Sequence, residues 1–216
     1  MSLKKSSKEI LLRSLFAFIG VAILGLGAAT LRIGQVGLDP YTSSNIALGN
    51  LLGLSLGVYQ LLMNGFLLVL LVVFGRKYIG TGTVINMVGA GFFIDFFTKM
   101  MNTYQIEPNS WFSQLLFLFI GVLIFTFGAS FYMAASVGTA PYDAIAPVIV
   151  DYTKLDYRFV RVVQDVGFSL IAYFFQGPVG MGTFISAFLM GPFIKFWDQK
   201  ISYPIIEGTL KTLGEV

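Results

Sequence analysis

The chain of 216 residues is apolar and poor in charge: 56% of its residues are hydrophobic, only 12% are charged, and the net charge is +3. A soluble domain carries about 25% charged residues, so this composition excludes a disordered or nucleic-acid-coating protein and argues strongly against a soluble enzyme with one core. The absence of Cys and His also excludes disulfides, thiolate or imidazole zinc sites and a Ser-His-Asp triad. We therefore expect a polytopic membrane protein that is not an enzyme, with no metal site and no cofactor.

The predicted elements begin after a basic segment, residues 1–8, which leads into a long apolar run. This run is too long for the core of a signal peptide, so we interpret it as a retained first helix. A helix needs about 20 apolar residues to cross a bilayer. Runs that fit are 11–31, 57–75, 81–98, 113–134, 158–176 and 181–199. The sequence thus predicts an all-α membrane protein with six transmembrane helices in a single membrane domain, residues 1–216.

The distribution of Lys and Arg predicts the orientation, because cytoplasmic loops are enriched in both. If the N-terminus is cytoplasmic and the chain crosses six times, only Arg32 and Lys99 lie outside. The expectation is a multi-pass protein of the bacterial cytoplasmic membrane with both termini in the cytoplasm and the lipid bilayer as its surroundings.

Comparison of the chain with itself at a shift of about 101 residues shows an internal duplication. Residues 36–42 (VGLDPYT) fall on residues 137–143 (VGTAPYD). With one residue removed, residues 80–83 (GTGT) fall on residues 180–183 (GMGT). Matches of Gly, Pro, Tyr and Thr at a nearly constant offset are not explained by apolar composition, so they indicate a tandem repeat.

The two repeats, residues 11–101 and 112–200, each hold three of the predicted crossings. An odd number of crossings places the second copy upside down relative to the first. Such inverted-topology repeats recur in secondary transporters, whose sites lie where the repeats meet near the bilayer midplane.

A short polar segment follows the first span of each repeat. Asp39 is a good N-cap and Pro40 suits the first helical position, so a helix is expected to begin there and at its copy. The helix either lies on the membrane surface or re-enters the membrane, where its backbone must line a cavity or be buried in protein. Two re-entrant helix N-termini would suit the anionic group of a small solute. Because Asp39 and Asp143 sit at those starts, a cationic or zwitterionic solute also stays open.

Polar residues inside the spans give the remaining site candidates. Gln60 and Asn64 lie four apart, as do their counterparts Arg161 and Asp165, so each pair shares a helix face. An ion pair between Arg161 and Asp165 would lower the cost of burying both. Either the pair only holds helices together, or one or both residues contact solute or couple a proton. Asn86 either permits close helix packing or lines a polar cavity. The candidate substrate-binding residues are Asp39, Tyr41, Asn45, Gln60, Asn64, Asn86, Tyr142, Asp143, Arg161 and Asp165.

These motifs also carry a family resemblance. The duplicated Val-Gly-x-x-Pro-Tyr, the run 60–64 (QLLMN) and the run 80–86 (GTGTVIN) resemble the YczE/YyaS/YitT group of bacterial integral membrane proteins, in particular its YczE-like branch. The resemblance covers residues 11–200. It implies a membrane transport protein of unsettled substrate, and it brings no catalytic residues with it.

Three functions from different classes remain open. The first is a small-solute transporter or channel, for a small anion or zwitterion, in which Asp165 or Asp143 carries any coupled proton because burial disfavours a charged carboxyl. The second is a substrate-binding subunit of a larger importer, with partner subunits docked on the first span; a homodimer is equally compatible with the Gly-rich spans. The third is a membrane enzyme acting on a lipid or phosphate ester, with Mg²⁺ held by acidic residues on the cytoplasmic side, namely Asp143, Asp151, Asp156 and Asp165.

Overall fold

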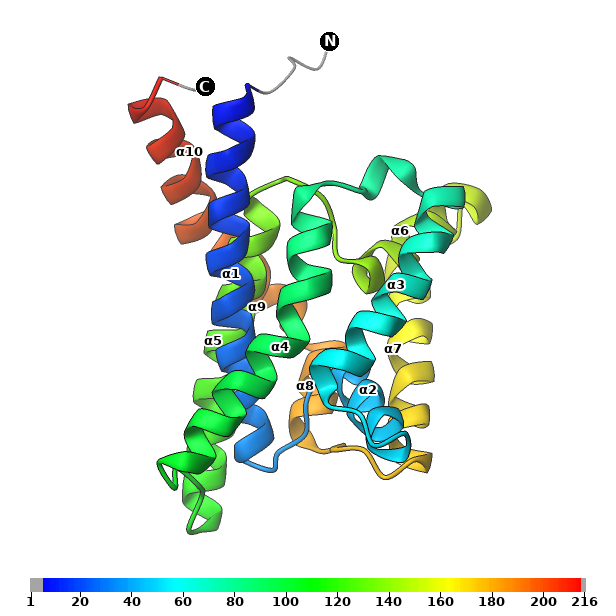
Figure 1. The fold of residues 1–216 in the computed structure, drawn as a ribbon, viewed down its shortest axis with the longest axis vertical. Helices are drawn as coiled ribbons and strands as arrows, with labels where there is room; N and C mark the ends of the chain where they lie inside the picture. Colours follow the sequence, from blue (N-terminus) through cyan, green and yellow to red (C-terminus); the bar gives the residue numbers. More distant parts are fainter. Residues whose placement is uncertain (1–5, 215–216) are drawn as a thin grey trace.

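The computed structural model describes residues 6–214, and every regular element in this part of the chain is a helix (Figure 1). Lys4 and Lys5, which the orientation argument places in the cytoplasm, lie outside the described residues. The elements in chain order are α1 (Ser7–Ile33), α2 (Pro40–Leu51), α3 (Leu56–Phe74), the 3-10 turn η1 (Arg76–Tyr78), α4 (Thr81–Thr103), α5 (Trp111–Ala134), α6 (Pro141–Thr153), α7 (Tyr157–Phe174), α8 (Met181–Phe188), α9 (Met190–Trp197), the π-helical turn η2 (Asp198–Ser202) and α10 (Tyr203–Thr212).

Four of these helices, α1, α3, α4 and α5, are long and apolar enough to cross a membrane. The prediction of an all-α membrane protein is therefore confirmed, whereas six crossings stay a prediction. The fifth predicted span coincides with α7, which carries three charged side chains, Arg158, Arg161 and Asp165.

The sixth predicted span, residues 181–199, is not one continuous helix. It breaks at Leu189, between α8 and α9. Pro192 provides the physical reason. It has no N–H to donate to the carbonyl of Phe188, and its ring clashes with that carbonyl, which interrupts a helix. The chain then continues through η2 into α10, a helix that the sequence analysis did not predict.

The predicted start of the first Pro-Tyr helix is confirmed. Asp39 is the N-cap of α2 and its side chain accepts a hydrogen bond from the Thr42 N–H at 3.0 Å, with Pro40 in the first turn. In the second copy Ala140 occupies the cap position and cannot accept through its side chain. Its own N–H donates instead to the buried hydroxyl of Tyr132.

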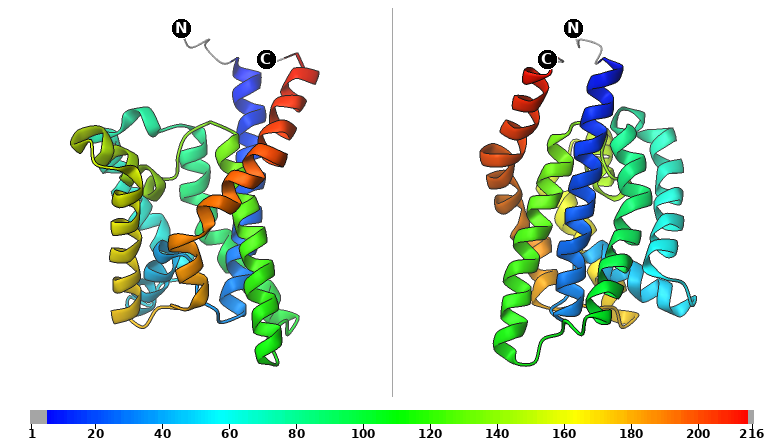
Figure 2. Two further views of the ribbon diagram at one scale, coloured as in Figure 1. Left: turned by 180° about the vertical axis from the view of Figure 1, so that it is seen from behind. Right: turned by 60° about the vertical axis from the view of Figure 1, so that its left-hand side comes forward.

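Helices α1 and α5 lie side by side and form the spine of the molecule (Figures 1 and 2). They approach closely because glycines face the partner backbone. A Cβ built on Gly20, Gly27 or Gly128 would overlap backbone atoms of the facing helix. Small residues permit this packing without a gap, as is common between membrane helices.

Corresponding elements of the two repeats run in opposite directions in Figure 1. There α1 descends and α5 ascends, α3 ascends and α7 descends, and α4 descends while α8 and α9 ascend. The helix α2 runs from near the middle of the molecule to its lower end, and α6 runs from near the middle to the upper end.

Candidate functional site

Each Gly-x-Gly-Thr motif bonds to the loop that precedes the Pro-Tyr helix of the other repeat. The Gly82 N–H donates to the Val137 carbonyl at 2.7 Å, and the Gly182 N–H donates to the Val36 carbonyl at 2.7 Å. The two contacts are equivalent under the sequence repeat, so each repeat holds the other through the same pair of motifs. We call these two contacts the reciprocal loop contacts.

The loops that make these contacts depend on glycine. Gly37 has φ +88° and Gly138 has φ +115°, a region that side chains disfavour. A Cβ on Gly37 would lie 2.7 Å from Thr183 Oγ1, and one on Gly138 would lie 2.6 Å from Thr83 Oγ1. The Val-Gly and Gly-x-Gly-Thr motifs are therefore two halves of one contact.

The two Pro-Tyr helices meet at a stacked pair of tyrosines. The rings of Tyr41 and Tyr142 lie parallel, with centroids 4.3 Å apart and planes at 15°, and Phe168 of α7 packs edge-on against both. The Tyr41 hydroxyl donates to Asn64 Oδ1 at 2.7 Å. In the second repeat the Tyr142 hydroxyl donates to Asp165, the counterpart of Asn64. The same bond thus ties each Pro-Tyr helix to the next helix of its own repeat.

The second repeat replaces this neutral arrangement with a charged one. Arg161 forms ion pairs with Asp165 at 3.2 Å and with Asp143 at 3.0 Å, and its guanidinium lies 4.9 Å from the ring centroid of Tyr142. The predicted ion pair between Arg161 and Asp165 is confirmed. Asp165 is buried, whereas about a third of the Asp143 side chain is exposed.

Three further candidates of the first repeat hold buried polar atoms that are incompletely bonded. The second carboxylate oxygen of Asp39 is buried and has no hydrogen-bond partner. Asn45 is fully buried with its amide near the Tyr41 phenol, but neither amide atom makes a well-aligned hydrogen bond. Gln60 packs against Gly91 of α4 with its carbonyl oxygen buried and unpaired.

Asn86 is buried on α4 next to Met87, whose carbonyl accepts from the Asn64 amide at 3.4 Å. The structure therefore gathers Tyr41, Asn64 and Tyr142 with Arg161 and its two partners into one cluster. Gln60 lies at the contact of α3 with α4. Whether any of the candidates binds substrate stays a prediction.

Sequence reasoning missed several residues around this cluster. Phe168 of α7 packs on both tyrosine rings, and the Gln164 amide donates to the Tyr142 carbonyl at 3.0 Å. Ser43 is fully buried, and its hydroxyl donates to the Pro178 carbonyl at 2.9 Å. Helical spacing could have identified Phe168, three residues after Asp165, and Gln164, three residues after Arg161. Nothing local in the sequence indicates that Ser43 meets Pro178.

The four acidic residues considered as Mg²⁺ ligands have separate contacts. Asp143 and Asp165 pair with Arg161, Asp151 lies 2.7 Å from Lys77 Nζ, and Asp156 caps α7. The Lys77 hydrogen bond, aided by one from Tyr78, holds the pKa of Asp151 below its usual value. Within residues 6–214, no three acidic side chains come together as a metal site would require.

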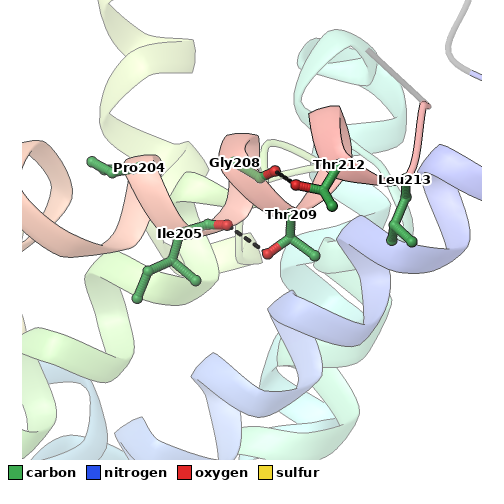
Figure 3. Close-up of a pocket in the computed structure, with 6 residues that line it drawn as sticks. All are labelled: Pro204, Ile205, Gly208, Thr209, Thr212 and Leu213. Atoms are coloured by element: carbon green, nitrogen blue, oxygen red, sulfur yellow. Dashed lines mark hydrogen bonds between the residues drawn. The ribbon is translucent and has the colours of Figure 1, made fainter.

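A hollow on the surface of α10 lies far from this cluster (Figures 1 and 3). Its two threonine hydroxyls do not face a ligand, because each donates to a carbonyl of its own helix, at 2.8 and 2.9 Å. Its lining consists of Pro204, Ile205, Gly208, Thr209, Thr212 and Leu213.

Comparison with known proteins assigns the chain to a family. A family described as "Family of unknown function (DUF6198)" matches residues 11–199. The chain belongs to this family. Among relatives of this DUF6198 protein, the "Uncharacterized membrane protein YczE" of Bacillus subtilis is 27% identical over 88% of this chain and 86% of its own length. The "Uncharacterized protein YyaS" of the same organism is 26% identical over 88% of this chain and 91% of its own.

A third relative, an "Uncharacterized protein" of Haemophilus influenzae, is 26% identical over 82% of this chain and 79% of its own length. No solved structure matches the chain. The resemblance to the YczE-like proteins is confirmed, and with it the assignment as a membrane protein.

Proposed function

We propose that this DUF6198 protein is a small-solute transporter or channel, not an enzyme, with its substrate site between the two repeats near the bilayer midplane. The observation that carries the proposal is the reciprocity of the two repeats. The same motifs, Val-Gly and Gly-x-Gly-Thr, join the repeats twice, and buried polar side chains surround the tyrosine pair between those joints. Repeats that meet around a central polar site are the arrangement of many secondary transporters.

The proposal includes six crossings, with α7 as the fifth and the broken helix α8–α9 as the sixth. Three features support it. The charges that α7 would bring into the membrane include Arg161 and Asp165, which are paired. Discontinuous helices such as α8–α9 are frequent at transporter sites. The chain also enters α1 and leaves α10 at the same end of the molecule (Figure 1), as two cytoplasmic termini require.

In this proposal α2 and α6 are re-entrant helices. Their starts lie near the middle of the molecule and their ends point to opposite faces (Figure 1), and Pro-Tyr positions at both starts are buried, including Tyr41 and Tyr142. Transport would proceed by separation of one reciprocal loop contact at a time, which opens the tyrosine pair to one side and then to the other. Arg161 would exchange its contact with the partly exposed Asp143 for the carboxylate or other anionic group of a small anion or zwitterion.

Site-directed cysteine labelling tests this proposal directly, because the chain contains no Cys and the unmodified protein therefore does not react with a maleimide at a thiol. Thr42→Cys and Asp143→Cys are labelled with an impermeant maleimide in right-side-out and inverted membrane vesicles. Thr103→Cys, at the exposed end of α4, is the control that should react from one side only. Reaction of both site positions from both sides, with protection by amino acids or small carboxylates, supports transport. If Thr42→Cys reacts only from outside and Asp143→Cys only from inside, without protection, the Pro-Tyr helices lie on the surface and the proposal falls.

A further inference from the structure

The carboxylate of Asp39 differs from the other acidic groups near the tyrosine pair because it lacks a compensating cation. Asp143 and Asp165 both pair with Arg161. None of the ion pairs in residues 6–214 reaches Asp39. One of its oxygens accepts from the Thr42 N–H at the start of α2, and the other is buried without a partner. A buried, unpaired charge is costly, and proteins usually neutralise it.

The surroundings of Asp39 add negative charge and leave no positive one unused. Asp165 and Asp143 lie near enough to repel it. Arg161, the one cation facing this region from α7, is shared between those two carboxylates. Of the other helices that pack on α2, α8 carries no ionisable side chain and α3 carries only Tyr59. Both ion pairs of this guanidinium therefore go to other carboxylates, and none goes to Asp39.

A second, independent feature lies on the same helix. Asn45 is fully buried, and both atoms of its amide lack a hydrogen-bond partner. It flanks the Tyr41 phenol, which also feels the charge of Asp39. Unsatisfied buried amides are rare because each one loses its hydrogen bonds to water without a replacement. Asp39 and Asn45 thus each hold a buried oxygen without a donor, and a carboxylate oxygen in this state favours a bound cation.

We propose that Asp39 is the binding site of a monovalent cation, a proton or Na⁺, that neutralises its carboxylate during the transport cycle. The inference rests on the proposed transporter and names its coupling ion. It assigns that role to Asp39 and not to Asp165 or Asp143, whose charge Arg161 already compensates. The first repeat thus binds an exchangeable cation at Asp39, whereas the second carries the permanent positive charge of Arg161.

Infrared difference spectroscopy of the purified full-length protein in lipid nanodiscs tests this assignment without any transported solute. The sample is exchanged between acidic and neutral buffer, and between NaCl and choline chloride, while the carbonyl band of protonated carboxylic acids is recorded. The variant is Asp39→Asn, which keeps the helix cap because Asn caps as well as Asp. The matched control is Asp151→Asn, which removes an exposed carboxylate that Lys77 already neutralises.

If Asp39 binds protons, the wild type and Asp151→Asn show a buried carboxylic-acid band that responds to pH, and Asp39→Asn lacks it. If it binds Na⁺, replacement of choline by Na⁺ abolishes that band in both proteins and leaves Asp39→Asn unchanged. Identical responses of the wild type and Asp39→Asn to both exchanges overturn the assignment. A band specific to Asp39 together with one-sided maleimide labelling would support the cation site and refute the proposed transporter. Two-sided labelling without that band would support the transporter and refute the cation site.

Discussion

The charged triad of the second repeat can be compared with its neutral counterpart in the first. Arg161→Gln removes the cation that pairs with Asp165 and Asp143. The double variant Arg161→Gln/Asp165→Asn reproduces the side chains of Gln60 and Asn64 at the equivalent positions. The first repeat shows that this neutral pair supports the same tyrosine hydrogen bond, because Tyr41 donates to Asn64 at 2.7 Å.

The size of the effect follows from the burial of each partner. Breaking a buried ion pair costs about 3–5 kcal/mol, because it leaves one charge uncompensated. Asp165 is 4% exposed, but Arg161 is 29% exposed and Asp143 is 33% exposed. Water therefore screens the pair with Asp143, which contributes about 0–1 kcal/mol. We expect Arg161→Gln to lower the free energy of unfolding by about 3 kcal/mol, at the lower end of the buried range. The double variant should recover about 2 kcal/mol of that loss, since it also removes the buried charge of Asp165 that had lost its partner.

Reversible unfolding in mixed micelles, driven by sodium dodecyl sulfate and followed by circular dichroism, measures these differences. Lys77→Gln is the control, since it removes a cation from an exposed ion pair with Asp151 and should lower the unfolding midpoint far less than Arg161→Gln does. A loss below about 1 kcal/mol for Arg161→Gln would show that Asp165 does not depend on the pair. A double variant no more stable than Arg161→Gln would refute the reasoning that the uncompensated charge causes the loss.

Three further predictions concern other contacts. Gly138→Ala should destabilise the protein by at least about 1 kcal/mol, because φ is positive and the new Cβ meets a threonine hydroxyl. The control Gly191→Ala, which has open space around it, should not destabilise the protein. Thermal unfolding in nanodiscs measures both variants. Arg13→Met should lower the free energy of unfolding by about 3 kcal/mol, since it leaves two glutamates of a buried network unpaired. Limited proteolysis of this variant should then cut at α10, and an uncut helix would contradict the prediction. Because Lys77 lowers the pKa of Asp151, their contact stabilises the fold above the ordinary carboxyl pKa and loses that effect as the pH falls through the lowered value. Asp151→Asn should flatten the acid limb of a plot of Tm against pH; an unchanged limb would refute this.

Several features of the molecule follow from the sequence because they depend on local spacing. Apolar runs of span length and the bias of Lys and Arg require no knowledge of tertiary contacts. Asp39 and Pro40 specify where α2 begins, since a cap acts within its own first turn. Arg161 and Asp165 pair because residues four apart on a helix face the same way. The duplication can also be recognised from the sequence alone, because its two copies hold the same motifs in the same order.

What only the tertiary structure decided is which motifs meet across the repeats. Nothing local indicates that Gly82 bonds to Val137, or that Tyr41 stacks on Tyr142, because both contacts join segments far apart in the chain. The break between α8 and α9, by contrast, has a local cause, Pro192, which hydropathy alone does not register. The unpaired state of Asp39 is a property of its neighbours. Whether a carboxylate is compensated depends on which cations the packing brings near it, and here the packing gives Arg161 to Asp143 and Asp165.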